Sequence, residues 1–112
     1  AKQKDNATAS TGEGCDLWFY TKQNGQSIMG ERARFTNYGH FIPAANNTYD
    51  LGDTSIRWRN VYTNDLNLSN EGSANSVDGT WGDYTIQEGE SDLFLINNRS
   101  GKKYKFNLTE VS

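Results

Sequence analysis

The sequence predicts an all-β protein built from short antiparallel hairpins. Aromatic residues are frequent, with three Trp, six Tyr and five Phe in 112 residues, whereas there is a single Pro. Several segments alternate apolar and polar residues with a period of two, the period of a strand that buries one face. Between these segments lie Gly- and Asn-containing dipeptides, which turn a chain tightly. Together these observations favour strands and turns over helices.

The first predicted strands form a hairpin. Residues 16–22 are mostly aromatic and other strand-forming residues, and Asn24-Gly25 follows them as a turn. Residues 31–36 then place Ala33 and Phe35 on one side and arginines on the other. After a further turn, residues 41–43 are expected to be extended.

The middle of the chain lacks the alternating pattern of the first strands. Residues 50–53 have the composition of a turn, and either Asp53 or Thr54 is expected to cap a single helical turn over 55–58. The chain then resumes an extended path, in which Leu66 and Leu68 alternate with polar residues.

The last third has the clearest pattern and predicts a three-stranded antiparallel meander. Residues 84–87 alternate, residues 92–97 are apolar on both sides, and residues 102–108 alternate again. We expect the middle one of these to be a central strand covered on both faces. Whether the strands pair within one chain or between chains stays open at this point.

Changes in composition divide the chain into four parts. We expect a flexible leading segment over 1–15 and a β-hairpin module over 16–68. A loop or linker of small and polar residues follows over 69–80, and the meander forms a tip module over 81–112.

The composition is too polar for a self-sufficient monomer. Hydrophobic residues make up 34% of the chain, against about 45–50% in typical globular domains. The abundance of aromatic residues and a net charge of only −3 argue against disorder. We therefore expect partner chains to supply the missing core.

Charge and residue types exclude several classes of function. An isoelectric point near 5.0 argues against nucleic-acid binding, and no apolar run is long enough for membrane insertion. A lone Cys15 excludes an intrachain disulfide framework. The chain has few residues of the types that catalyse reactions or bind metals, since its one histidine, His40, lies in a predicted turn. We therefore expect no enzyme activity, no metal and no cofactor.

Residues 47–62, NTYDLGDTSIRWRNVY, resemble an element common in distal tail fibres and tailspikes of bacteriophages. Residues 17–39 are similar to a strand–turn–strand unit of marine-phage fibres, and residues 81–106 resemble the closing module of some fibres. The resemblance implies a homotrimeric virion protein, made in the bacterial cytoplasm, that helps the extracellular fibre attach to a host-surface polysaccharide or protein receptor. The auto-cleaving chaperone domain that often follows the first element has no counterpart here, so self-proteolysis is not carried over.

Large apolar side chains in otherwise polar segments are the predicted trimer core, because a three-fold axis brings three copies of each together. The alternative is an ordinary core within one chain, which stays open for Trp58 and Tyr62. The trimer-core candidates are Leu51, Ile56, Trp58, Val61, Tyr62, Phe94 and Phe106.

Aromatic residues beside turns are candidates for receptor or glycan binding, because sugars bind aromatic platforms edged with polar side chains. The candidates are Trp81, Tyr84, Trp18 and Tyr38. Each ring could instead pack in a core. Two alternatives to a structural role follow: a lectin-like glycan-binding module that acts as a monomer, and a polysaccharide depolymerase with a groove between subunits.

Overall fold

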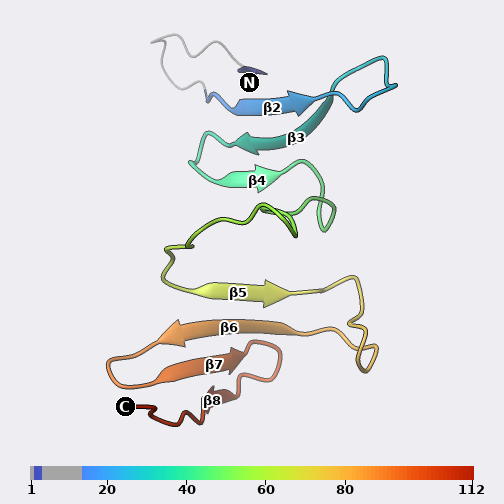
Figure 1. Ribbon diagram of the computed structural model, residues 1–112. Coiled ribbons are helices and arrows are strands. Elements are labelled where there is room, and N and C mark those ends of the chain that lie inside the picture. Colours follow the sequence, from blue (N-terminus) through green and yellow to red (C-terminus); the bar gives the residue numbers. More distant parts are fainter. Residues whose placement is uncertain (1, 4–13) are drawn as a thin grey trace. The chain divides into compact units, whose positions relative to one another are not determined.

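The computed structural model describes residues 2–3 and 14–112, and these residues form an all-β structure. Two four-stranded antiparallel sheets are present, and none of the described residues is helical (Figure 1). The chain divides into two compact units, Ala1–Arg57 and Trp58–Ser112, with one sheet in each. The predicted fold class is therefore confirmed. The leading segment 1–15 falls mostly outside the described residues.

Sheet A belongs to the first unit and contains the predicted hairpin. Its order is β1-β2-β3-β4, all antiparallel. Asn24-Gly25 lies in the turn between β2 and β3, where Gly25 has a φ of 88°, a value that costs glycine little. The strands are β1 (Lys2–Gln3), β2 (Leu17–Thr21), β3 (Gly30–Phe35) and β4 (Phe41–Pro43).

One face of sheet A is mostly apolar, with Thr21 and the guanidinium of Arg32 at one end of it. Directly opposed residues of antiparallel strands share a face. Leu17 pairs with Phe35, which in turn pairs with Phe41, and Phe19 pairs with Ala33. We call this set the apolar face of sheet A: Leu17, Phe19, Ala33, Phe35, Phe41 and Pro43.

The opposite face of sheet A carries the ion pair between Arg34 and Glu31. Trp18 pairs with Arg34, and Tyr20 with Glu31 across an irregularity that skips one residue of β3. The skipped residue, Arg32, donates hydrogen bonds from Nε to Thr21 Oγ1 (2.8 Å) and from Nη1 to the Tyr49 hydroxyl (3.0 Å). This bulge therefore ties the segment after β4 to the sheet.

Sheet B belongs to the second unit, in the order β5-β6-β7-β8. The predicted three-stranded meander is present as β6, β7 and β8, and β5 extends it on the free side of β6. The bounds are β5 (Leu66–Ser69), β6 (Asp83–Glu88), β7 (Leu93–Asn97) and β8 (Lys103–Lys105).

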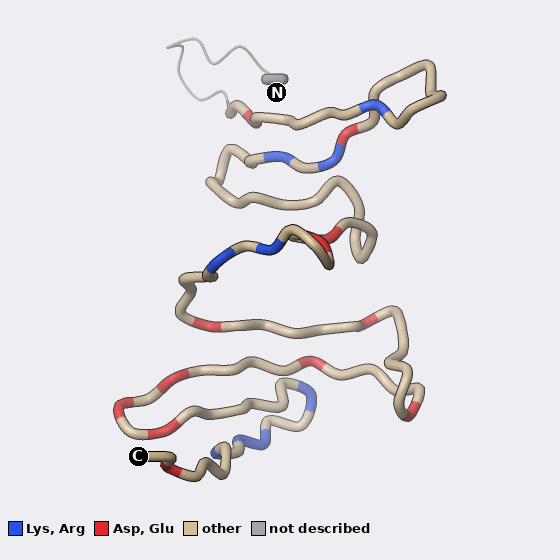
Figure 2. The backbone as a smooth tube through the Cα atoms, viewed as in Figure 1, with Lys and Arg blue, Asp and Glu red and all other residues tan. Residues whose placement is uncertain are grey.

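The two faces of sheet B also differ. Leu66 pairs with Ile86, which pairs with Leu95, whereas Asn67 pairs with Thr85 on the other face. Lys103 and Lys105 of β8 lie on this second, polar face, since they pair with Ile96 and Phe94. Figure 2 marks the lysines of this segment in blue along the backbone. The apolar face of sheet B contains Leu66, Leu68, Tyr84, Ile86, Leu93, Leu95 and Tyr104, with Glu88 and Asn97 at its ends.

The segment 69–80 is a structured loop rather than a linker between modules. It joins the paired strands β5 and β6, and its ends are held together by hydrogen bonds. The backbone N–H of Asn70 donates to Gly82 O (3.3 Å), and that of Gly82 donates to Asn70 Oδ1 (2.8 Å). The division between units lies instead at Arg57 and Trp58, because β5 finds its partner in the meander.

The predicted helical turn over 55–58 is absent, although its predicted cap forms. The carboxylate of Asp53 accepts hydrogen bonds from the N–H groups of Ser55 (2.9 Å) and Ile56 (2.6 Å). The N–H of Asp53 itself donates to the carbonyl of Ile56 (3.0 Å). These bonds close a tight turn, after which the chain continues without a helix or strand as far as β5.

No apolar side chain is buried among the described residues. Thr85, at 7% exposure, is their one buried side chain. β7 is central in its sheet, as predicted, but its Phe94 is 37% exposed. The expectation that this strand is covered on both faces is therefore wrong for a single chain. Within the described residues, each unit therefore has strands and turns but no buried apolar core.

Candidate functional site

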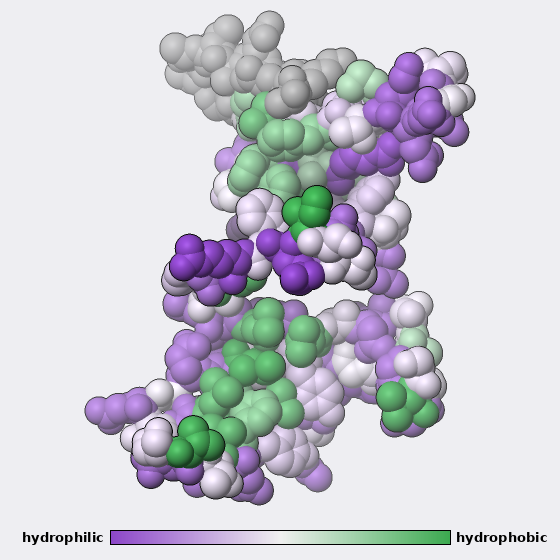
Figure 3. Space-filling model, in the orientation of Figure 1, coloured by the Kyte–Doolittle hydropathy of each residue, from purple (hydrophilic) through white to green (hydrophobic). Residues whose placement is uncertain are grey.

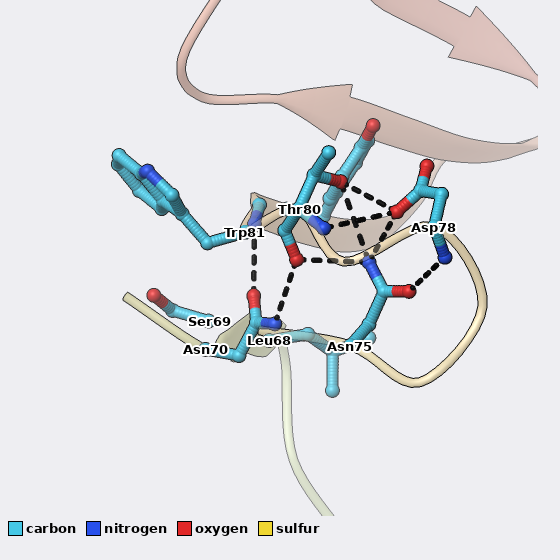
Figure 4. A pocket seen from close by; sticks show the side chains of 9 residues that line it. Leu68, Ser69, Asn70, Asn75, Asp78, Thr80 and Trp81 are labelled. Atoms are coloured by element: carbon cyan, nitrogen blue, oxygen red, sulfur yellow. Dashed lines mark hydrogen bonds between the residues drawn. The ribbon is translucent and has the colours of Figure 1, made fainter. Parts of the chain in front are cut away.

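A pocket of about 490 Å³ lies beside the end of the β5–β6 ladder (Figure 4). Its volume falls in the range of small-ligand sites, roughly 300–1,000 Å³. Aromatic and aliphatic groups from the strands meet polar side chains from the loop that joins them. The lining residues are Leu68, Ser69, Asn70, Asn75, Asp78, Thr80, Trp81, Gly82 and Tyr84.

Asn75 organises the polar wall of the pocket. Its Oδ1 accepts from the N–H groups of Val77 (2.8 Å) and Asp78 (2.9 Å). Its Nδ2 donates to Asp78 Oδ1 (2.8 Å) and to the carbonyl of Thr80 (2.9 Å). Side-chain bonds to nearby backbone groups are what Asn and Asp supply in turns. The wall is therefore fixed by the loop's own hydrogen bonds before any ligand binds.

Asp78 is the charged group of this wall. Thr80 donates to its Oδ1 from both the hydroxyl (2.7 Å) and the backbone N–H (3.1 Å). These bonds, the hydroxyl of Thr80 first and then the amide of Asn75, lower the pKa of the Asp78 carboxyl below its usual value. The pocket consequently keeps a negative charge at neutral pH.

Trp81 forms the aromatic edge and is half-buried. Its indole extends away from the side of the pocket formed by Asn75 and Asp78 (Figure 4). The guanidinium of Arg99 lies 3.7 Å from the indole centroid and donates from Nη1 to the Trp81 carbonyl (2.9 Å). This cation–π contact and hydrogen bond hold the indole in place, and they occupy one of its faces.

Tyr84 depends on a glycine beside it. A Cβ at Gly82 would lie 2.9 Å from Tyr84 Cε2, too close for an unshifted ring. The Tyr84 hydroxyl accepts a hydrogen bond from Asn97 Nδ2 (3.3 Å). Gly82 therefore provides the space in which this ring closes the pocket.

Two of the four predicted binding aromatics come together here. Trp81 and Tyr84 line the same pocket, whereas Trp18 and Tyr38 belong to the other unit. Trp18 is half-buried under the guanidinium of Arg34, 4.2 Å from its ring. Tyr38 is 83% exposed in the turn between β3 and β4.

The trimer-core candidates fall into two groups. Phe94 lies on the polar face of sheet B and Phe106 is half-buried just after β8. The other five lie between β4 and β5, outside any strand, and are the most exposed. Their exposed fractions are 70% for Leu51, 77% for Ile56, 66% for Trp58, 69% for Val61 and 91% for Tyr62.

Sequence reasoning missed a cluster of phenylalanines on the apolar face of sheet A. The ring centroids of Phe35 and Phe41 are 4.6 Å apart, and Phe19 lies 6.2 Å and 6.1 Å from them. The alternation of residues 31–36 identified one member of this face. The other two could be assigned to it only once the register between strands was known.

Comparisons with known proteins identify no relative. No protein-family model matches the chain, and neither a curated protein nor a solved structure is similar enough to count as a match. The described residues contain no group of three or more acidic, His or Cys side chains placed to hold a metal ion. Across the same residues, no helix has the length and apolarity needed to cross a membrane.

Proposed function

We propose that this chain is a structural, trimer-forming segment of the distal part of a bacteriophage tail fibre, with a role in host-surface attachment and not in catalysis. The observation that carries the proposal is the lack of a buried apolar side chain among the described residues. Ordered strands without a core of their own need apolar cover from elsewhere, because apolar burial is the main favourable term in folding.

The exposed anchors between β4 and β5 support the same proposal. They lie in residues 47–62, the segment that resembles the tail-fibre element. A monomer rarely exposes several large apolar side chains so close together in one segment. Here the exposed fractions reach 66% for Trp58 and 91% for Tyr62. The need for partner chains is inferred from the exposed fractions of these apolar side chains. That the assembly contains three chains is inferred from the resemblance to tail fibres. A virion location and a polysaccharide or protein receptor follow from the resemblance alone.

The solution mass of the chain tests the proposal. Light scattering over a range of concentrations is expected to give about three times 12.6 kDa, and to hold on dilution. A stable, folded species near 12.6 kDa would contradict it, because such a monomer would have to cover its apolar residues alone.

Substitution of Trp58 separates a core between chains from a core within one chain. Trp58→Ala is expected to weaken assembly as well as thermal stability, because a buried Trp→Ala change costs about 3–5 kcal/mol and here recurs in every chain. Tyr38→Ala, at a residue 83% exposed in a turn, is the control and should leave the mass unchanged. An intact trimer that only melts earlier would place Trp58 in an intrachain core.

Glycan binding is a second candidate function, favoured by the pocket at Trp81. An aromatic edge beside a wall of amide, hydroxyl and carboxylate groups matches the mixture of apolar and hydrogen-bonding surface that a sugar presents. A glycan array probed with the chain and with Trp81→Ala tests it. Binding that is lost in Trp81→Ala but kept in Tyr38→Ala would support the pocket as the site. Binding unaffected by Trp81→Ala would exclude it.

A further inference from the structure

The pocket beside the β5–β6 ladder is lined by one group that is charged at neutral pH, the carboxylate of Asp78. We infer that this carboxylate selects the ligand: the pocket takes a sugar unit that is neutral or carries an amino group, and it excludes one that carries a carboxylate, a sulfate or a phosphate. The inference rests on the glycan-binding function proposed above and adds the class of sugar to it.

The two oxygens of the Asp78 carboxylate have different surroundings. Oδ1 accepts three hydrogen bonds from the loop, one from Asn75 Nδ2 (2.8 Å) and two from Thr80, through its hydroxyl (2.7 Å) and its backbone N–H (3.1 Å). No hydrogen bond from another described residue reaches Oδ2, and Figure 4 shows this oxygen turned away from the three bonds to Oδ1. The residue is also exposed. Oδ2 is therefore a charged acceptor that the loop holds in place and leaves open to a ligand.

The donors of Asn75 and Thr80 are already used within the loop. Asn75 Nδ2 donates to Asp78 and to the carbonyl of Thr80 (2.9 Å), and the Thr80 hydroxyl donates to Asp78. An ionised sugar group that enters a pocket loses water, which donors or cations must replace. This wall presents to it the like charge of Asp78 instead. An acidic sugar is consequently disfavoured twice, by lost hydration and by repulsion.

A hydroxyl or an ammonium group suits the same oxygen. Each donates a hydrogen bond, and bonds to an ionised acceptor are about twice as strong as those between neutral groups. Leu68 and Trp81 add apolar surface to the lining. Figure 3 shows apolar side chains gathered over the strands of sheet B, with hydrophilic side chains among those of the loop that joins β5 and β6. A neutral or amino sugar, with C–H groups on one side and donors on the other, matches both surfaces.

Arg99 is the cation that could instead attract an acidic sugar. Its guanidinium lies 3.7 Å from the Trp81 ring centroid, and its Nη1 donates to the Trp81 carbonyl (2.9 Å). Arg99 is not among the residues that line the pocket, whereas Asp78 is. An acidic sugar inside the pocket would therefore contact the carboxylate and not the guanidinium.

A glycan array with matched sugars tests the inference on the assembled wild-type chain. One set contains glucose, glucosamine with a free amine and glucuronic acid, and the other contains the three corresponding galactose derivatives. The neutral or amino member of at least one set should bind about tenfold or more tightly than the acid, because like charges repel strongly where little water separates them. Trp81→Ala should abolish this binding.

Two results on the wild-type chain would overturn the inference. The first is an acidic sugar that binds as tightly as its neutral counterpart and is lost in Trp81→Ala, which would leave the glycan-binding function standing. Loss of that acidic sugar in Arg99→Gln would then identify the guanidinium as the group that selects the ligand. The second is an array on which no glycan binds, which would overturn the glycan-binding function as well.

Asp78→Asn and Glu71→Gln form a matched pair of variants. Each removes one negative charge from the segment 69–80, but Glu71 is exposed and does not line the pocket. Asp78→Asn should reduce the preference for the neutral over the acidic sugar by about fivefold or more at low salt, where charges are least screened. Glu71→Gln should leave the preference unchanged. Equal effects of the two variants would overturn the role of Asp78, and the comparison of sugars on the wild-type chain decides the inference if Asp78→Asn fails to fold.

Discussion

Replacement of Thr85 by valine tests whether a polar network, rather than a core, fixes the second unit. Thr85 is 7% exposed, and its hydroxyl donates to Asn67 Oδ1 (2.7 Å) while accepting from Asn98 Nδ2 (2.9 Å). These bonds connect β5, β6 and the turn after β7. Valine has the same shape and suits a strand, so the change removes the hydroxyl without leaving a cavity.

The expected cost is a difference of two terms. Two net hydrogen bonds of about 1 kcal/mol each are lost. Burial of a methyl group in place of the hydroxyl stabilises the folded state by about 0.8 kcal/mol. Thr85→Val should therefore destabilise the protein by about 1 kcal/mol, a fall in melting temperature of about 4–8 °C for a domain of 60–100 residues.

Urea unfolding followed by circular dichroism measures this cost. Wild type and variant must be compared at the same chain concentration, because assembly adds to apparent stability. Thr109→Val is the matched control, since Thr109 is exposed and has no hydrogen bond to any described residue, and it should change stability by less than about 0.5 kcal/mol. A Thr85→Val protein as stable as wild type would refute the idea that this network fixes the sheet.

Two further substitutions test local turns. Gly101 has a φ of +78° in the turn between β7 and β8, and an added Cβ would meet no other atom. Gly101→Ala should therefore lower the free energy of unfolding in urea by about 1 kcal/mol, through backbone strain alone. A gain in stability would show that this conformation is not required. At Asp53, hydrogen bonds from the N–H groups of Ile56 and Ser55 lower the pKa of the carboxyl below its ordinary value of 3.8. A depressed folded-state pKa means that the carboxylate stabilises the folded state above pH 3.8 and ceases to do so as the pH falls through the folded pKa. Asp53→Ala should therefore be less stable than wild type at neutral pH, with a difference that shrinks in acid; a difference independent of pH would contradict this role.

The sequence by itself determined the fold class, most turns and the meander. Those features depend on neighbours along the chain. An alternation of apolar and polar residues over only a few positions is enough to predict a strand. Glycines such as Gly25 and Gly101 mark turn positions where φ is positive. For the same reason the Asp53 cap could be predicted, since donor and acceptor lie within three residues of each other.

The sequence also brought together part of the candidate site. Trp81 and Tyr84 were recognised individually as aromatics beside turns, and they share a pocket because β6 starts between them. Asn75, the residue that orders the polar wall, lies in the segment 69–80, for which the sequence predicts only a loop or a linker of small and polar residues. Its role depends on five side-chain hydrogen bonds within a loop whose ends are closed by Asn70 and Gly82.

Only the tertiary structure decided which strands pair and what each face presents. Leu66 and Leu68 alternate in the same way whether β5 joins the first unit or the second, and their pairing with Ile86 and Tyr84 is set by contacts distant in sequence. The same holds for Phe19 and Phe41, which reach one apolar face through the register of β2 and β4 on β3. A shift of one residue would send either ring to the charged face, and local periodicity contains no information about that shift.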